Sequence, residues 1–394
     1  MHPQPHLSDP AVYCAAPWTH VHLRADGFFS VCCRAKRAAS SISAQTVEEY
    51  WNGEEMKRLR VAMMDHQPPP DICTDCINNV GTVRAARWSH NERAYADMDH
   101  LLASTAKDGT TSFRPNTLDI RTNLCNLKCR MCCSASSSAI HSESLLAGLP
   151  VTPLGPHARN EHLLAFSDED LKRLKYISWA GGEPFMSRVH WELMDSLDRL
   201  GCHDIPIWYN TNLSFPGNTR ARAEKLLGRF SRTRLGASID AVGEDFDYLR
   251  EGAHYDEVIS NLLGLRRVLP KVMISVDCTV TSLGLFSLDA LVRFCIEHRV
   301  MLSCKSVVVP SWDWLSIGAL RRDVLEARLV SAAQASAGTP LQAPMSAFVS
   351  HVRKQYRPSV PDLIRCRERE QIRGKAGYLE SRIGTDLNSH AVDL

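Results

Sequence analysis

Three closely spaced cysteines are the feature that most restricts what this chain of 394 residues can fold into. Cys125, Cys129 and Cys132 have the spacing C-x3-C-x2-C on one short segment. Three thiolates can ligate three irons of a [4Fe–4S] cube, whereas a fully ligated cube takes four. The fourth iron is then open to a small molecule. The spacing therefore predicts a loop built around a reactive metal cluster.

A zinc clasp or a set of buried thiols is the alternative explanation for these cysteines. Structural zinc sites take four protein ligands and often draw them from paired C-x2-C knuckles. Here the first gap is three residues long, and Cys133 directly follows Cys132, where it cannot comfortably share the same metal. These differences favour the iron–sulfur interpretation.

Charge and composition weigh against several classes of protein. The 46 Lys and Arg residues nearly balance the 44 Asp and Glu residues, which gives a net charge of +2. This balance argues against a large polyanion-binding face, so nucleic acid is an unlikely partner. No apolar run approaches the roughly 18–20 residues of a membrane span, and the first ten residues lack a secretory signal. Most of the fourteen cysteines sit in tight motifs, which favours metal ligation in a reducing cytoplasm over disulfides.

Strands and helices alternate from residue 117 to about 310, which predicts a parallel sheet with crossover helices. The expected strands are Thr117–Thr122, Tyr176–Ala180, Pro206–Thr211, Leu235–Ile239, Val272–Val280 and Met301–Val309. The expected helices between them are Asp168–Lys175, Val189–Leu200, Thr219–Phe230, Tyr255–Leu269 and Leu288–Arg299. Ser167 and Asp170 form a capping-box variant before the first of these helices. In barrels built from parallel strands and crossover helices, active-site residues lie at the C-terminal ends of the strands.

The predicted domain organisation has four parts. Residues 1–95 form a small cysteine-rich domain with a helix over Thr46–Met64, and residues 96–116 form a linker. Residues 117–310 form the α/β domain, and residues 311–394 form a helical extension with a polar tail. The helical pieces expected in the extension are Leu320–Ala335, Ser346–Tyr356 and Val360–Gly374.

The cysteine spacing and the ends of the later strands resemble those of the radical S-adenosylmethionine (SAM) superfamily. The second strand ends in Gly181, Gly182, Glu183 and Pro184, similar to the GGEP motif that binds the ammonium group of SAM. The alternative is an ordinary Gly-Gly turn with an exposed glutamate. Placed one strand after the cysteine motif, the segment favours the SAM-binding interpretation.

Three further strand ends carry the same resemblance. Asn210 and Thr211 are similar to the segment beside SAM, although Leu213 stands where glycine is usual. Ser238 and Asp240 resemble a motif whose side chains reach the ribose and carboxylate of SAM, and the alternative for Asp240 is a turn or helix cap. Val280 lies where the family places an apolar residue against adenine.

The resemblance implies a partial (β/α)6 TIM-like barrel and a defined chemistry. In this family SAM chelates the open iron, and an electron from the cluster cleaves it to a 5′-deoxyadenosyl radical. The implied reaction is hydrogen abstraction from a peptide or small-metabolite substrate, with an electron donor such as flavodoxin or ferredoxin. The alternatives are a tRNA-modifying radical SAM enzyme and a non-catalytic zinc or iron–sulfur binding protein.

A second group of cysteines lies near the amino terminus. Cys14, Gly27 and Cys32 follow the pattern C-x(9–15)-G-x4-C, which resembles the opening of SPASM and twitch domains, here placed before the barrel. With Cys73 and Cys76, four thiolates suffice to ligate an auxiliary [4Fe–4S] cluster that assists oxidation or substrate binding, and a structural zinc site is the alternative. Cys33 competes with Cys32 as the ligand, and the spacing after the glycine favours Cys32.

Two histidines, His20 and His22, flank this segment. They could tune or ligate the auxiliary cluster. We expect solvated or packed histidines instead.

Overall fold

The computed structural model describes residues 12–36, 46–78, 86–154, 166–215, 217–306 and 315–358. Contacts divide the chain into two compact units, and each is described by itself. The first unit comprises Met1–Leu124, Thr152–Trp208 and Arg229–Arg232, and the second comprises Cys125–Val151, Tyr209–Gly228 and Thr233–Leu394. The domain bounds 1–95, 96–116, 117–310 and 311–394 stay predictions.

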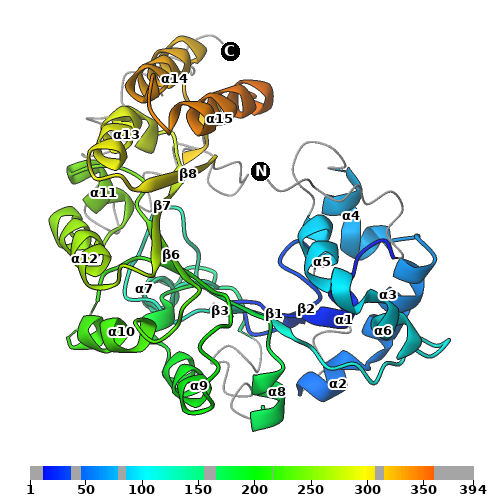
Figure 1. The fold of residues 1–394 in the computed structure, drawn as a ribbon. Coiled ribbons are helices and arrows are strands. Elements are labelled where there is room, and N and C mark those ends of the chain that lie inside the picture. The colour runs from blue at the N-terminus through cyan, green and yellow to red at the C-terminus, as the bar shows by residue number, and fades with distance from the viewer. Residues whose placement is uncertain are drawn as a thin grey trace. The chain divides into compact units, whose positions relative to one another are not determined.

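Eight strands form one mostly parallel sheet in the order β2-β1-β3-β4-β5-β6-β7-β8 (Figure 1). Their bounds are β1 His20–Leu23, β2 Phe29–Ser30, β3 Thr117–Thr122, β4 Tyr176–Gly181, β5 Ile207–Thr211, β6 Thr233–Ser238, β7 Met273–Val280 and β8 Met301–Ser306. Strand β1 pairs antiparallel with β2 and parallel with β3. The pairs β3–β4, β6–β7 and β7–β8 are also parallel. The order is linear, so the sheet is an open α/β barrel, as predicted.

The six predicted strands correspond to β3 through β8, and the last residues predicted for β8 lie outside the described residues. Strands β1 and β2 were not predicted, because they are only four and two residues long. A strand of that length is too short to display an alternating pattern. Strand β1 nonetheless extends the sheet, so residues predicted to belong to the cysteine-rich domain pair with β3.

The helices of the first unit are α1 Ala16–Thr19, α2 Val47–Trp51, α3 Glu54–Met64, α4 Pro70–Asn78, α5 Ala86–Ala94, α6 Met98–Ala103, α8 Asp168–Lys172 and α9 Arg188–Arg199. Helix α1 contacts α3, α5 and β1, and α8 contacts α9. The single helix predicted over Thr46–Met64 is two helices, α2 and α3. The break falls at Asn52–Gly53, where a Cβ on Gly53 would lie 2.8 Å from the Glu49 carbonyl oxygen.

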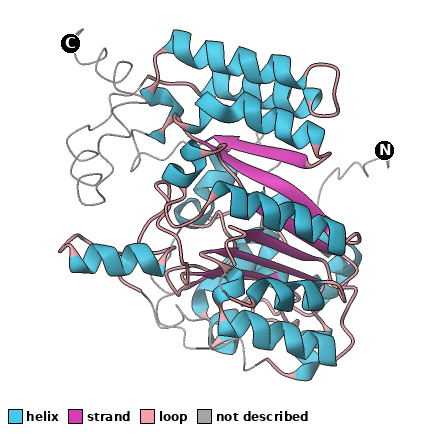
Figure 2. Ribbon diagram, turned by 90° about the vertical axis from the view of Figure 1, so that its left-hand side faces the viewer, coloured by secondary structure: helices cyan, strands magenta, loops and turns pink. Residues whose placement is uncertain are grey.

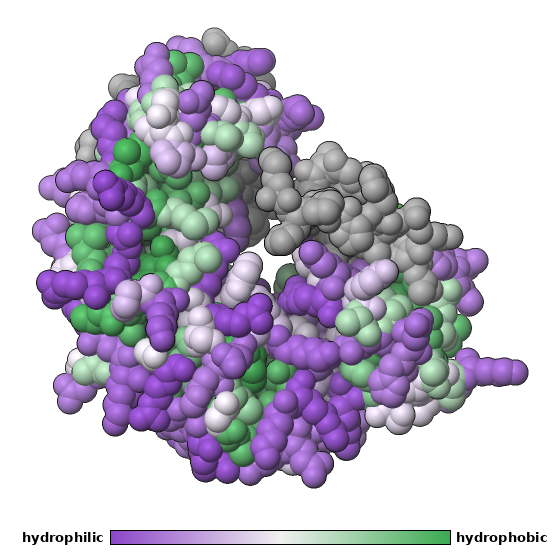
Figure 3. Space-filling view, in the orientation of Figure 1, coloured by the Kyte–Doolittle hydropathy of each residue, from purple (hydrophilic) through white to green (hydrophobic). Residues whose placement is uncertain are grey.

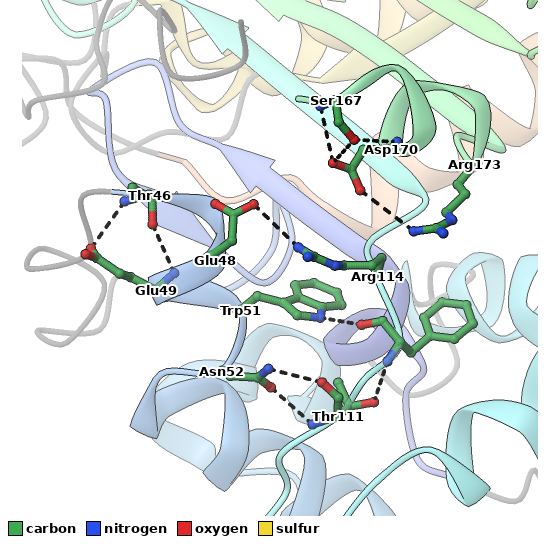
Figure 4. A network of polar contacts seen from close by, with 11 residues as sticks. Thr46, Glu48, Glu49, Trp51, Asn52, Thr111, Arg114, Ser167, Asp170 and Arg173 are labelled. Atoms are coloured by element: carbon green, nitrogen blue, oxygen red, sulfur yellow. Dashed lines mark hydrogen bonds and ion pairs between the residues drawn. The ribbon is translucent and has the colours of Figure 1, made fainter. Parts of the chain in front are cut away.

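The predicted linker is tied to α2 by polar contacts (Figure 4). Trp51 Nε1 donates to the Phe113 carbonyl oxygen at 2.7 Å. Asn52 donates to the Thr111 carbonyl oxygen and accepts from the Thr111 N–H, each at 3.1 Å. Figure 4 also shows Ser167 with Asp170, where the predicted capping box of α8 is confirmed.

Arg60 in α3 holds several backbone segments of this unit together. Its side chain is fully buried and donates to the carbonyl oxygens of Pro17, Trp51 and Gly109 at 2.6–3.0 Å. Burial lowers the pKa of Arg60 to about 10, so the guanidinium stays charged at neutral pH. A buried charge with these partners satisfies carbonyl groups that would otherwise lack hydrogen bonds.

In the second unit, helices alternate with the strands and pack beside them (Figure 2). Their bounds are α7 Ser138–Leu146, α10 Thr219–Leu227, α11 Glu244–Leu249, α12 Tyr255–Val268, α13 Leu288–Glu297, α14 Arg322–Ser336 and α15 Gln342–Gln355. Helices α13 and α14 pack together, and α15 contacts both α14 and β8 (Figure 1). The predicted helices Leu320–Ala335 and Ser346–Tyr356 correspond to α14 and α15, whereas Val360–Gly374 lies outside the described residues.

Strand β7 shows how the core of the second unit is made. Ile274, Val276 and Cys278 alternate with more polar residues and are buried. Hydrophilic side chains dominate the face shown in Figure 3, with apolar ones scattered between them. Among the residues described, no helix combines the length and the apolar character that crossing a membrane requires.

Candidate functional site

The cysteine loop of residues 125–132 rests on the start of α7. Cys125 and Cys129 are buried, and Cys132 is partly exposed. The Cys125 N–H donates to the hydroxyl of Ser138, the first residue of α7, at 3.1 Å. Ser137, the N-cap of α7, donates from its hydroxyl to the Leu127 carbonyl oxygen at 2.7 Å. These bonds hold the backbone that carries the three thiols.

The thiols of Cys129 and Cys132 are protonated at neutral pH in the absence of a metal. Burial raises the pKa of the Cys129 thiol above its usual range. Burial and the neighbouring thiols of Cys129, Cys133 and Cys125 raise the pKa of Cys132 strongly. Thiolate is the form that ligates a metal, so metal binding here must displace the protons. The donor set, three cysteines on one short loop, fits a cluster with one open iron.

Arg250 connects the cysteine loop to the end of β6. Its Nε and Nη2 atoms lie 2.7 and 2.6 Å from Asp240 Oδ2, and its Nη1 lies 3.8 Å from the Cys129 sulfur. Burial opposes the positive charge, but Asp240 and the thiols keep the pKa of Arg250 above its usual range. Arg250 directly follows α11, and its contacts with Asp240 and Cys129 were not predicted from the sequence.

Asp240 makes its contacts within the protein. Its Oδ2 accepts from Arg250, and its Oδ1 accepts from the Thr279 N–H at 2.6 Å. Its side chain is fully buried. Its contact with SAM stays a prediction, and the geometry gives it a role in holding Arg250 beside Cys129.

The segment after β5 also contacts the loop. Asn212 Nδ2 lies 3.1 Å from Asn126 Oδ1 and 3.9 Å from the Cys125 sulfur. Leu213, where the resemblance leads one to expect glycine, has a φ of 55° and is fully buried. A leucine therefore occupies the left-handed backbone conformation that glycine adopts most easily. Asn212 directly follows Thr211 at the end of β5, and its contacts with the cysteine loop were not predicted from the sequence.

The segment after α11 supports the other side of the loop. The Lys128 and Arg130 N–H groups donate to the carbonyl oxygens of Glu251 and Leu249, both at 2.8 Å. The side chains of Lys128 and Arg130 also pair with the Glu251 carboxylate. These contacts fix the backbone on either side of Cys129.

The remaining candidate SAM contacts of the second unit lie at strand ends. Thr211 ends β5, Ser238 ends β6 and Val280 ends β7. The Thr211 hydroxyl accepts from the Leu213 N–H at 3.1 Å. Asn210 points to β7, where its Nδ2 donates to Asp277 Oδ2 at 3.0 Å.

The segment of residues 181–184 belongs to the first unit and packs against the end of β3. Gly181 has a φ of 96°, and a Cβ there would lie 2.4 Å from the Thr122 carbonyl oxygen. A Cβ on Gly182 would lie 2.2 Å from the Leu124 carbonyl oxygen. The Glu183 side chain is fully buried, and Pro184 begins a short 3-10 helix, Pro184–Met186. The glycines thus allow the backbone of this segment to approach the backbone at the end of β3 and just beyond it.

The amino-terminal cysteines line one cavity in the first unit. Cys14, Cys32, Cys73 and Cys76 all face it, and His90 of α5 is part of its wall. Burial raises the pKa of Cys73 to about 12 and that of Cys32 well above its usual range. Cys33 is exposed and is not among the lining residues. Four thiols around one cavity fit a fully ligated cluster.

Family models match two parts of the chain. Residues 120–286 match the radical SAM superfamily, and residues 14–77 match SPASM, an iron–sulfur cluster-binding domain. No curated protein matches the chain.

Among solved structures, SuiB of Streptococcus suis bound to the precursor peptide SuiA is 20% identical, with a TM-score of 0.38. That match covers 65% of this chain and 54% of SuiB. The structure of anSMEcpe with bound AdoMet is 17% identical, with a TM-score of 0.41, and the match covers 56% of this chain and 57% of that one. The chain therefore spans little more than half the length of these proteins.

Proposed function

Because this chain is a radical SAM enzyme with a SPASM iron–sulfur domain, we propose that it abstracts hydrogen from a peptide or small-metabolite substrate. When bound, a [4Fe–4S] cluster with an open iron and SAM supply the 5′-deoxyadenosyl radical for that step. The observation that carries the proposal is the loop of Cys125, Cys129 and Cys132. Its first two thiols are buried and are contacted by Asn212 after β5 and by Arg250 after α11.

The residues around this loop have definite tasks in the proposal. Cys125, Cys129 and Cys132 ligate the cluster. Arg250 places a positive charge 3.8 Å from the Cys129 sulfur, which favours electron density on that thiolate. Asn212 offers an amide N–H to the Cys125 sulfur at 3.9 Å. Hydrogen bonds and charges near the sulfurs are among the features that set the potential of such clusters.

The residues proposed to bind SAM are those at the ends of the later strands. They are Gly181, Gly182, Glu183, Pro184, Asn210, Thr211, Ser238, Asp240 and Val280. The glycines support this role by bringing the segment against the backbone just before Cys125 in the chain.

A polar strand face supports the proposed substrate class. Asp277 of β7 accepts from Asn210 at 3.0 Å and from Ser275 at 3.2 Å, and Arg234 of β6 lies 3.6 Å from it. The Asp277 side chain keeps 17% of its surface exposed. Such a face suits a substrate with hydrogen-bonding groups, as peptides and polar metabolites have.

The auxiliary site is proposed to assist oxidation or substrate binding. Its ligands in the proposal are Cys14, Cys32, Cys73 and Cys76, and their common cavity supports this set. The position of Cys33 outside the lining supports Cys32 as the ligand. An external electron donor such as flavodoxin or ferredoxin belongs to the same proposal.

Anaerobic reconstitution tests the proposal. We expect a brown protein with about eight irons per chain, in two four-iron clusters, that forms 5′-deoxyadenosine from SAM and a reductant. Replacing Cys129 by alanine should lower the iron content to about four and abolish 5′-deoxyadenosine formation.

Cys133→Ala is the matched control, because Cys133 adjoins the loop but is exposed and has no place in the ligand set. It should keep the iron content and the cleavage of SAM. A colourless protein that leaves SAM intact would rule the proposal out, as would equal losses in both variants.

A further inference from the structure

Two histidines and an aspartate lie together on one face of the sheet in the first unit. His20 and His22 are two residues apart in β1, and His22 lies opposite Asp119 in the parallel pair of β1 with β3. Side chains two residues apart on a strand point to the same face of the sheet. One potential ligand atom from each of the three residues lies within 4.8 Å of the others.

The three side chains are buried, and one of them lacks hydrogen-bond partners. His20, His22 and Asp119 are 3%, 6% and 5% exposed. Neither ring nitrogen of His20 has a hydrogen-bond partner. A buried polar group left without a partner costs roughly 1–3 kcal/mol, so such a group calls for a partner that the protein itself does not supply.

The two oxygens of Asp119 face different partners. Arg121 Nε lies 3.3 Å from Asp119 Oδ1, and the other oxygen, Oδ2, faces His22.

We propose that His20, His22 and Asp119 bind a divalent transition-metal ion such as Zn²⁺, at a site separate from both groups of cysteines. Two imidazoles with one carboxylate form a ligand set that such ions prefer. Zinc bonds of about 2.0–2.2 Å place tetrahedral ligand atoms roughly 3.3 Å apart. The 3.1 Å between His22 Nδ1 and Asp119 Oδ2 already matches this separation. Three protein ligands leave one position for water or another small ligand.

The site adjoins the auxiliary cavity through a shared histidine. The ring of His90 meets the ring of His20 edge-on, with centroids 4.7 Å apart, and His90 also lines the cavity of the four cysteines. The inference rests on these contacts and does not depend on the proposed reaction.

Zinc loading of the reconstituted protein tests the site. The protein, with its iron in place, is incubated with Zn²⁺ and desalted, and zinc and iron are then measured by mass spectrometry. We expect one retained zinc per chain. X-ray absorption at the zinc edge should show only nitrogen and oxygen neighbours at about 2.0–2.2 Å and no sulfur at about 2.3 Å.

Two variants and a control localise the ion. His20→Phe keeps a ring against His90 and removes one ligand, and Asp119→Asn removes the charge. Each should weaken zinc binding by at least about 100-fold, since even changes to the partners of ligands cost 10- to 100-fold. His203→Ala is the control, because His203 forms a surface pair with Asp198 at 2.9 Å. It should retain the zinc.

Three results would overturn the inference. The unsubstituted protein could retain no zinc, His20→Phe could retain as much as the control, or the absorption spectrum could show sulfur neighbours. The spectrum is measured on the unsubstituted protein, so it decides the matter even if a variant loses its iron and fails to fold.

Discussion

Arg250 is the residue whose single charge has the clearest expected effect on the cysteine loop. Its guanidinium lies between the Asp240 carboxylate and the Cys129 sulfur. Arg250→Gln should leave the iron content unchanged, shift the reduction potential of the cluster to a more negative value and slow 5′-deoxyadenosine formation. The rate should fall about 10- to 100-fold, the equivalent of a charged hydrogen bond of about 1.5–3 kcal/mol. The potential is followed by electron paramagnetic resonance.

Arg199→Gln is the control for this change, because Arg199 pairs with Asp168 at 2.7 Å on the protein surface. Exposed pairs of this kind contribute about 0–1 kcal/mol, so the control should behave as the unsubstituted protein. An Arg250→Gln protein with full iron content and an unchanged rate would contradict the assigned role.

At the scale of single residues, the sequence predicts chemical types better than it predicts contacts. The cysteine spacing alone selects Cys125, Cys129 and Cys132, because ligands on one loop are close in sequence. The pairing of Arg250 with Asp240 spans ten residues and the turn after β6, and its approach to Cys129 spans 121. Such contacts depend on where the side chains point in the folded chain, and a sequence motif does not contain that information.

At the scale of elements, Gly181 fits the end of β4 against the end of β3. Alanine there would be strained by the φ of 96°. Its Cβ would also lie 2.4 Å from the Thr122 carbonyl oxygen. Gly201→Ala is a matched control, because Gly201 has a φ of 71° and nothing lies within 4 Å of its added Cβ. We expect Gly181→Ala to lower the free energy of unfolding by about 1–3 kcal/mol more than the control does.

Urea denaturation measures this difference. The midpoint of the transition should shift while its slope stays the same, because the surface exposed on unfolding does not change. Equal losses in the two variants would mean that the backbone at Thr122 yields and that the close approach of the two strand ends is unimportant for stability.

The strands from β3 onward were predictable, and β1 was not. Strand β3 was predicted with its observed bounds, because six residues between clear boundaries suffice to show a strand. Strand β1 has four residues and directly follows the short helix α1, so its pairing with β3 was invisible in the sequence. That pairing places His22 opposite Asp119, so the proposed metal site could not be predicted from the sequence either.

At the scale of the whole molecule, the two groups of cysteines are proposed to hold iron at two separate sites. The proposed auxiliary ligands are Cys14, Cys32 after β2, and Cys73 and Cys76 in α4, and all four line one cavity. The cysteine loop lies in the other compact unit. Each unit holds its own ligand set, so one cluster should be removable without loss of the other.

Cys76→Ala should therefore separate the two parts of the proposed reaction. Iron should fall to about four per chain, while SAM is still cleaved to 5′-deoxyadenosine at the remaining cluster. Cys33→Ala is the control, since Cys33 lies outside the cavity lining, and it should keep about eight irons. If Cys76→Ala also abolishes 5′-deoxyadenosine formation, the two sites are coupled in folding or in electron supply. If Cys33→Ala loses iron instead, Cys33 is the ligand and the cavity has a different wall.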